Sequence, residues 1–179
     1  MRIDPRSGQP PQTDDWLAAQ CRRIDAAGRE LAAAVGEVNQ RMEQSHSGQL
    51  GRRRLITESH LKQVEAACKT FHDVQLTVQS TLFDCEHELR DLRERDVDPV
   101  ELLVDGERLI RQYRFLRRRA RVIDGLLAYL PAVSAHAANC LEHLHHLRDG
   151  GPAGGPIAVA DCSFALVALD DVGATNAPR

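Results

Sequence analysis

The stretch LKQVEAACKTFHDVQLTVQSTLFDCEHELRDL, residues 61–92, decides the fold class. Its apolar residues recur every three or four positions, at Leu61, Val64, Cys68, Phe71, Val78, Leu82, Cys85, Leu89 and Leu92, and the polar Gln75 fills the remaining place in the pattern. An α-helix turns once every 3.6 residues, so this spacing puts one apolar stripe on one face. A stripe that keeps a seven-residue repeat is typical of a helix in a coiled coil.

The flanking segments carry the same periodicity. After residue 99, one column repeats every seven residues, at Leu102, Leu109, Leu116, Ile123, Leu130, Ala137 and Leu144. No proline lies between Pro11 and Pro99, so the strongest helix breaker is absent from a long part of the chain. We therefore predict helices at about 14–46, 52–96 and 99–148, with a kink near Pro131 in the third.

The sequence DVDPVE, residues 96–101, predicts a short turn between the second and third helices. Asp98 is expected to cap the third helix and Pro99 to be its first residue, while Gly150 and Gly151 end it. A turn this short implies an antiparallel hairpin. The predicted fold is all-α: an elongated antiparallel three-helix bundle, or a long helical hairpin, with coiled-coil heptads. If the hairpin is centred near residues 97–98, Arg108 and Arg111 lie opposite the acidic residues around 84–88.

The two ends of the chain differ from this helical domain, which we assign to residues 13–148. Residues 1–12 are rich in proline, glycine and glutamine and predict a disordered arm. Residues 149–179 predict a flexible linker followed by a possible docking tail, in which Phe164 and Leu166 are candidate partner contacts. Three interpretations of the tail stay open: a disordered end, packing on its own bundle, and docking on a partner.

Composition narrows the class of protein. The chain has 179 residues, of which 42% are hydrophobic and 4% aromatic, and a net charge of −3, so the whole chain is not a general binder of polyanions. No apolar run reaches the roughly 18 residues of a membrane-spanning helix. Five scattered cysteines without a CxxC pair favour a reducing compartment. We expect a cytoplasmic protein without a transmembrane segment.

One segment is strongly basic. The sequence RLIRQYRFLRRRARV, residues 108–122, contains seven arginines. Four of them form a stripe at helical spacing: Arg111, Arg114, Arg118 and Arg121. The stripe can be a solvated or salt-bridged helix face, a contact for an acidic protein partner, or a nucleic-acid contact. Nucleic-acid binding is disfavoured because a reader of polyanions usually carries a basic excess over its whole domain.

The sequence predicts neither an enzyme nor a cofactor or metal site. No catalytic motif is present, and a long helical hairpin rarely makes a pocket that shelters chemistry. His136, Cys140 and His143 are zinc-binding residue types at helical spacing. Cys140 belongs to the apolar column, however, where a cysteine behaves as a small apolar residue. We therefore expect no metal there.

Two segments resemble subunits of known helical complexes. The sequence RRRARVIDGLL, residues 117–127, resembles snapin, a small coiled-coil subunit of the complexes that position and form lysosome-related organelles. The sequences PVELL, residues 99–103, and LPAVSAHAAN, residues 130–139, are similar to the second subunit of augmin, a microtubule-branching complex. Both resemblances imply a subunit of a multi-chain helical assembly.

The predicted function is therefore that of a non-catalytic structural or adaptor subunit. Its partners would be other coiled-coil proteins in a hetero-oligomer, with a homo-oligomer as an alternative. The candidate contacts in the helical seam are Leu82, Leu89, Leu109, Leu116, Ile123 and Leu130. Two other functions stay open: a nucleic-acid-associated helical protein that uses the Arg111–Arg121 stripe, and a bacterial secreted effector or its chaperone.

Overall fold

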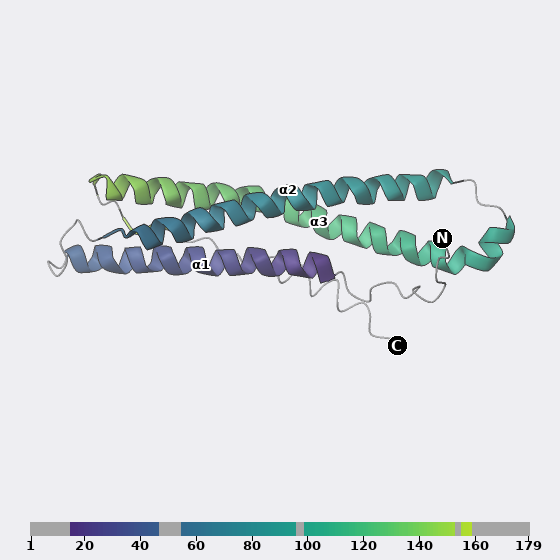
Figure 1. The fold of residues 1–179 in the computed structure, drawn as a ribbon, viewed down its shortest axis with the longest axis horizontal. Helices are drawn as coiled ribbons and strands as arrows, with labels where there is room; N and C mark the ends of the chain where they lie inside the picture. The colour runs from purple at the N-terminus through teal and green to yellow at the C-terminus, as the bar shows by residue number, and fades with distance from the viewer. Residues whose placement is uncertain (1–14, 47–54, 96–98, 153–154, 159–179) are drawn as a thin grey trace, which may run out of the picture.

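A computed structural model describes residues 15–46, 55–95, 99–152 and 155–158. They form three α-helices: α1 (Asp15–His46), α2 (Glu58–Glu94) and α3 (Pro99–Arg148). The all-α prediction is confirmed, and Figure 1 shows an elongated bundle. The predicted N-terminal arm, the Asp98 cap, and Phe164 and Leu166 of the tail lie outside the described residues.

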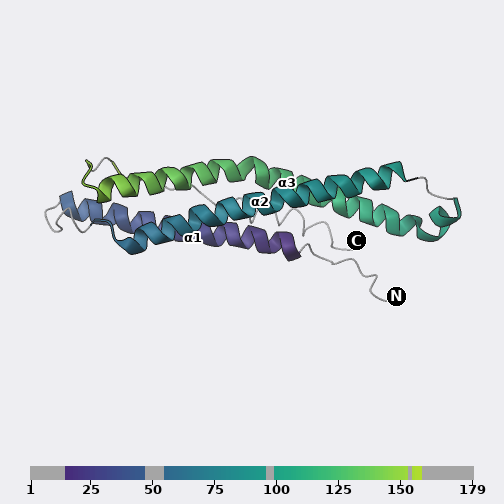
Figure 2. The same cartoon turned by 45° about the horizontal axis from the view of Figure 1, so that its top comes forward.

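The helices run up, down and up along one long axis. Figures 1 and 2 show α2 antiparallel to both α1 and α3, and α2 and α3 cross each other in both views. The third helix continues through Pro131 instead of ending there. Because α1 is the shortest helix, it accompanies only part of the α2–α3 hairpin. Near the beginning of α1, the Trp16 ring lies 5.0 Å from the Arg119 guanidinium on α3.

The buried side chains form two separate clusters. The larger lies where all three helices run together, and its fully buried members include Ile24 of α1, Phe71 of α2 and Ile123 of α3. The smaller cluster lies between α2 and α3 alone and has three buried members, Cys85, Leu89 and Leu116. Burying one large apolar side chain contributes about 1.5–3 kcal/mol. The three-helix part therefore holds most of the hydrophobic stabilisation.

The presence of α1 changes which residues of α2 are buried. The predicted stripe included Cys68 and Gln75, but these two are half-buried, and their neighbours Ala67 and Val74 are fully buried. A hairpin needs only one narrow stripe, whereas a helix between two neighbours must bury a wider face. Gln75 therefore lies at the edge of the core and not inside it.

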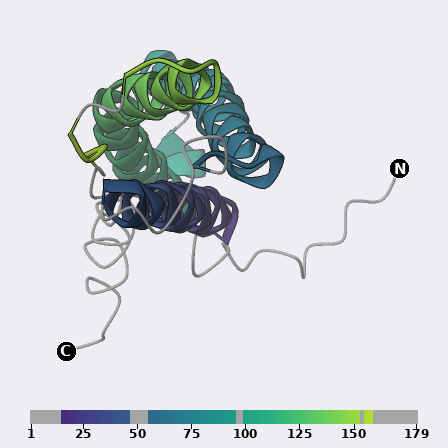
Figure 3. The same cartoon turned by 90° about the vertical axis from the view of Figure 1, so that its left-hand side faces the viewer.

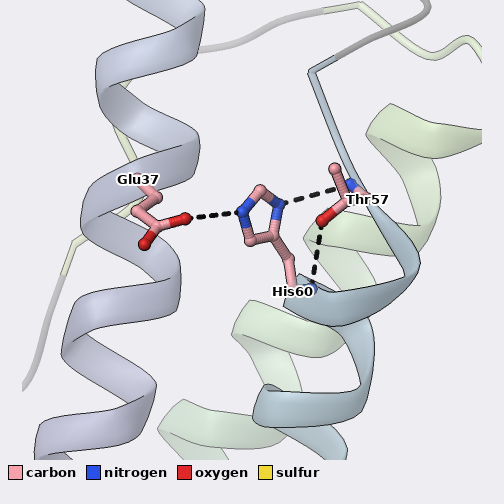
Figure 4. A network of polar contacts seen from close by, with 3 residues as sticks. All are labelled: Glu37, Thr57 and His60. Carbon is pink, nitrogen blue, oxygen red and sulfur yellow. Dashed lines mark hydrogen bonds and ion pairs between the residues drawn. The ribbon is translucent and has the colours of Figure 1, made fainter.

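The second helix begins six residues later than predicted, at Glu58 instead of 52. Thr57 caps it: the His60 backbone N–H donates to Thr57 Oγ1 (3.4 Å), and the Thr57 backbone N–H donates to His60 Nδ1 (3.3 Å). This reciprocal arrangement satisfies two backbone donors that a helix start leaves unpaired. Figure 4 shows that His60 also reaches Glu37 on α1, with Nε2 3.0 Å from Oε2. The cap thus joins α2 to α1.

The pairing register of α2 and α3 also differs from the prediction. Arg93 contacts Tyr113, and Glu65 lies 4.0 Å from His145, so the pairs centre on residues 103 and 105 and not on 97–98. The first turns of α3 therefore precede the paired region. Arg108 and Arg111 do not face the acids of α2. They pair within α3, with Asp105 (3.4 Å) and Glu107 (3.6 Å).

The chain reverses direction after α3 and packs back on the bundle. Gly150 adopts a left-handed φ of 92°, and the Gly151 N–H donates to His146 O (2.9 Å), which closes a Schellman cap. Ile157 is buried and exchanges two hydrogen bonds with the Asn39 side chain of α1 (2.8 and 2.9 Å). Residues 155–158 are thus docked on the bundle, and residues 156–158 begin the tail for which packing on its own bundle was one of the three open interpretations. Figure 3 shows the docked segment at the side of the bundle.

Candidate protein-interaction surface

The part of the hairpin beyond α1 is the candidate site, and we call it the distal arm. It comprises residues 83–94 of α2 and 99–118 of α3. Trp16, the second residue of α1, contacts Arg119, so α1 begins where the distal arm ends. Figures 1 and 2 show the two helices continuing past α1. A two-helix segment buries one stripe of each helix and leaves the other faces to solvent.

Large apolar side chains are exposed on the distal arm. Among the described residues, five large hydrophobic side chains are exposed, and four belong to the arm: Phe83 (71%), Leu103 (88%), Val104 (78%) and Ile110 (52%). The fifth, Leu76 on α2, lies in the three-helix part. Single exposed apolar residues are ordinary, but four on this short segment concentrate exposed apolar surface at one end of the molecule.

One face of α3 carries both apolar and basic side chains. Leu103 and Ile110 are seven residues apart, and the same face continues at helical spacing through three arginines. We call this the apolar–basic face: Leu103, Ile110, Arg114, Arg118 and Arg121. All five are exposed, and none of the three arginines forms a hydrogen bond or ion pair with another described residue. The positive charge of this face is therefore available to an anionic partner.

A contact between Arg93 and Tyr113 holds the two helices of the arm together. An Arg93 guanidinium N–H donates to the Tyr113 hydroxyl at 3.2 Å, and the guanidinium carbon lies 5.8 Å from the ring centre. This hydrogen bond, with added attraction from the charges of Arg93 and Arg117, lowers the pKa of Tyr113 from its ordinary value of 10.0. The contact joins α2 to α3 where, among the described residues, three side chains are buried between them.

The predicted seam residues divide into two groups. Leu89 and Leu116 are buried between the helices of the arm, and Leu82 and Leu109 are half-buried. Ile123 and Leu130 are fully buried in the three-helix core, so the chain itself uses them and they do not reach a partner. The sequence pattern did not separate the two groups on α3, because Leu109 and Leu116 belong to the same apolar column as Ile123 and Leu130.

Sequence reasoning missed Phe83, Leu103, Val104 and Ile110 as site residues. A signal was present for α3, because Leu103 and Ile110 repeat at seven residues outside the predicted core column. A comparable signal was present on α2, because Leu76 and Phe83 also repeat at seven residues outside the predicted stripe.

The thiol groups near the core are shielded. Burial raises the pKa of the Cys140 thiol above its ordinary value of 9.0, and the neighbouring Cys68 thiol adds to the effect. Burial likewise raises the pKa of Cys68. The Cys140 Sγ lies 3.5 Å from His136 Nε2, yet across the described residues no three His, Cys, Asp or Glu side chains are placed to hold a metal ion. Neutral thiols are poor nucleophiles, so the geometry supports packing rather than reactivity.

None of the helices in the described part of the chain is long and apolar enough to cross a membrane. Comparison of the chain with protein-family models, with curated proteins and with solved structures finds no match.

Proposed function

We propose that this protein is a non-catalytic subunit or adaptor of a multi-chain helical assembly, and that its distal arm is the contact surface. The observation that carries the proposal is the exposure of Phe83, Leu103, Val104 and Ile110 on a segment where α1 is absent. Covering these four side chains would remove apolar surface from water, at about 25 cal/mol for each Å². Burial of this apolar surface would therefore contribute favourable free energy to the binding of another protein.

The chemistry of the apolar–basic face defines the partner. Leu103 and Ile110 can pack against the apolar stripe of a partner helix. The three arginines, Arg114, Arg118 and Arg121, can then pair with acidic side chains one to three turns further along that helix. Charge complementarity of this kind sets the orientation and the rate of association more than the affinity. We therefore propose a helical partner with an apolar stripe that continues into acidic residues. A coiled-coil protein in a reducing, cytoplasmic compartment suits this description, and so do the resemblances to snapin and to the augmin subunit.

Paired substitutions on the arm test the proposal. The tagged full-length chain is used to capture proteins from its native cells after nuclease treatment, and the captured proteins are then reconstituted from purified components. Leu103→Asp with Ile110→Asp should abolish the complex, because it places charges in the apolar contact. Both positions are exposed, so the variant keeps its fold, which circular dichroism checks. Leu76→Asp is the control, since Leu76 lies outside the arm and is exposed to a similar extent as Ile110 (54% against 52%), and it should bind as the natural chain does.

The result decides between two kinds of partner. Loss of the reconstituted complex in the arm variant alone supports the proposal. Equal binding by the arm variant and the Leu76→Asp control contradicts it. The exposed arginines of the apolar–basic face also give the nucleic-acid alternative a physical basis. That alternative predicts retention of nucleic acid without nuclease treatment, with binding that weakens steeply as salt rises.

A further inference from the structure

The docked segment at residues 155–158 gives the C-terminal chain a direction. Ile157 bonds to Asn39, seven residues before α1 ends, and the Ala158 carbonyl lies 3.9 Å from Cys140 Sγ, eight residues before α3 ends. The chain has therefore turned back from the end of α3 and lies against both α1 and α3. Both helices run away from the distal arm. The chain at Ala158 is antiparallel to both and therefore runs toward the distal arm.

The surface ahead of Ala158 has features that suit an extended apolar segment. On α3, three half-buried side chains are spaced seven residues apart along the side that faces the docked segment: His136, Tyr129 and Val122. On α1, the residues seven, fourteen and twenty-one positions before Asn39 are also half-buried: Ala32, Asp25, which pairs with Arg29, and Ala18. Arg118 lies one turn before Val122 on α3, and Arg121 directly precedes Val122 in the sequence.

The residues that follow Ala158 match this surface in length and chemistry. Residues 159–170 extend to at most about 40 Å, whereas Cys140 and Arg121 are separated by about 28 Å of helix. The apolar run PIAVADCSFALVALDD, residues 156–171, places Phe164 and Leu166 before the acidic pair Asp170 and Asp171. The apolar part of this segment matches the half-buried side chains of Tyr129 and Val122. Its two acids match Arg118 and Arg121, which have no partners among the described residues.

We infer that residues 159–171 of the same chain bind along the boundary between α1 and α3. Phe164 and Leu166 cover Tyr129 and Val122, and the carboxylates of Asp170 and Asp171 pair with Arg118 and Arg121. The binding needs no partner protein and does not rest on the proposed function. Where that function holds, the segment and the acidic partner use the same two arginines, Arg118 and Arg121.

Energy transfer between two native residues tests the inference in the purified full chain. Trp16 is the single tryptophan, lies beside Arg119 at the far end of the proposed path, and serves as the donor. Cys162 carries a thiol-reactive acceptor in a Cys68→Ala background, because Cys21, Cys85 and Cys140 are buried. The natural sequence should show efficient transfer that does not depend on protein concentration and falls as salt rises.

Charge reversal gives the decisive comparison. Reversing Asp170 and Asp171 to Arg, or Arg118 and Arg121 to Asp, should lower the docked population several-fold, because attraction becomes repulsion. Combining the two reversals should restore the transfer, and Arg90→Asp, an exposed charge reversal on α2, should leave it unchanged. If neither reversal changes the transfer efficiency, the inference is wrong. Transfer that rises with concentration and is diluted by unlabelled chain also overturns it, because the segment would then bind a second copy.

Discussion

At the scale of single residues, the contact between Arg93 and Tyr113 shows how the arm is held where little is buried. The Tyr113 phenolate gains a hydrogen bond and a favourable charge from Arg93, which lowers its pKa below the ordinary 10.0. A lowered pKa in the folded state means that the added stability is present above the ordinary value. This stability is lost as pH falls through the lowered value.

Removing the guanidinium should therefore shift the titration of one tyrosine. We expect Arg93→Ala to raise the pKa of Tyr113 toward 10.0, measured by ultraviolet absorbance during an alkaline titration. The chain has two tyrosines, so the experiment uses a Tyr129→Phe background. Arg90→Ala, which removes a neighbouring arginine on the same helix, should leave the titration in place. An unchanged pKa in the Arg93→Ala chain would contradict the assigned cause.

At the scale of elements, the start of α2 depends on one short network. His60 Nδ1 accepts the Thr57 N–H, so the proton of the neutral ring is on Nε2, which donates to the Glu37 carboxylate. His60 is only 2% exposed, whereas Glu37 is largely exposed. One side chain thus completes the cap of α2 and contacts α1, as Figure 4 shows.

Loss of the Thr57 hydroxyl should weaken this junction measurably. We expect Thr57→Ala to lower the free energy of unfolding by about 1 kcal/mol, because the His60 N–H loses its acceptor at the helix start. Thr57→Ser keeps the hydroxyl and should cost much less. Urea unfolding followed by circular dichroism measures both. Equal destabilisation by serine and alanine would show that the threonine methyl group, and not the cap, is responsible.

The sequence predicted the elements unequally, for identifiable reasons. The bounds of α3 follow from strong local signals, with Pro99 at its first position and Gly150 after its last turn. The start of α2 was placed too early because its cap uses His60, which the usual Ser/Thr-x-x-Glu/Gln pattern does not include. The register was misplaced because the sequence of the turn does not reveal how many residues of α3 precede the first cross-helix contact.

The candidate site was predicted only in part, because exposure is a property of the tertiary structure. The arginine stripe follows from helical spacing, and the structure leaves Arg114, Arg118 and Arg121 exposed. Whether an apolar residue such as Ile110 is covered depends on how far α1 extends along the hairpin. Helix length and helix placement are set by different residues, and only the first could be estimated from sequence.

At the scale of the whole molecule, the two buried clusters predict two levels of stability. Ile123 lies in the larger cluster and Leu89 in the smaller one. We expect Ile123→Ala to cost about 2–5 kcal/mol and to lower the urea midpoint reported by Trp16, which lies in the three-helix part. Leu89→Ala should leave that midpoint nearly unchanged and make the arm more sensitive to limited proteolysis. Equal shifts of the midpoint would instead show one cooperative unit.

The limited reach of α1 along the hairpin has a consequence for the timing of motions. The distal arm lies beyond the three-helix part, and the first turns of α3 precede the region paired with α2. Local opening of the arm therefore costs less free energy, and its backbone amide hydrogens exchange with solvent sooner than those of the three-helix part. A protein that supplies a third helix would slow this exchange without any change of fold. Binding would then be detected as slower hydrogen exchange in the distal arm, while the exchange rate of the three-helix part stays the same.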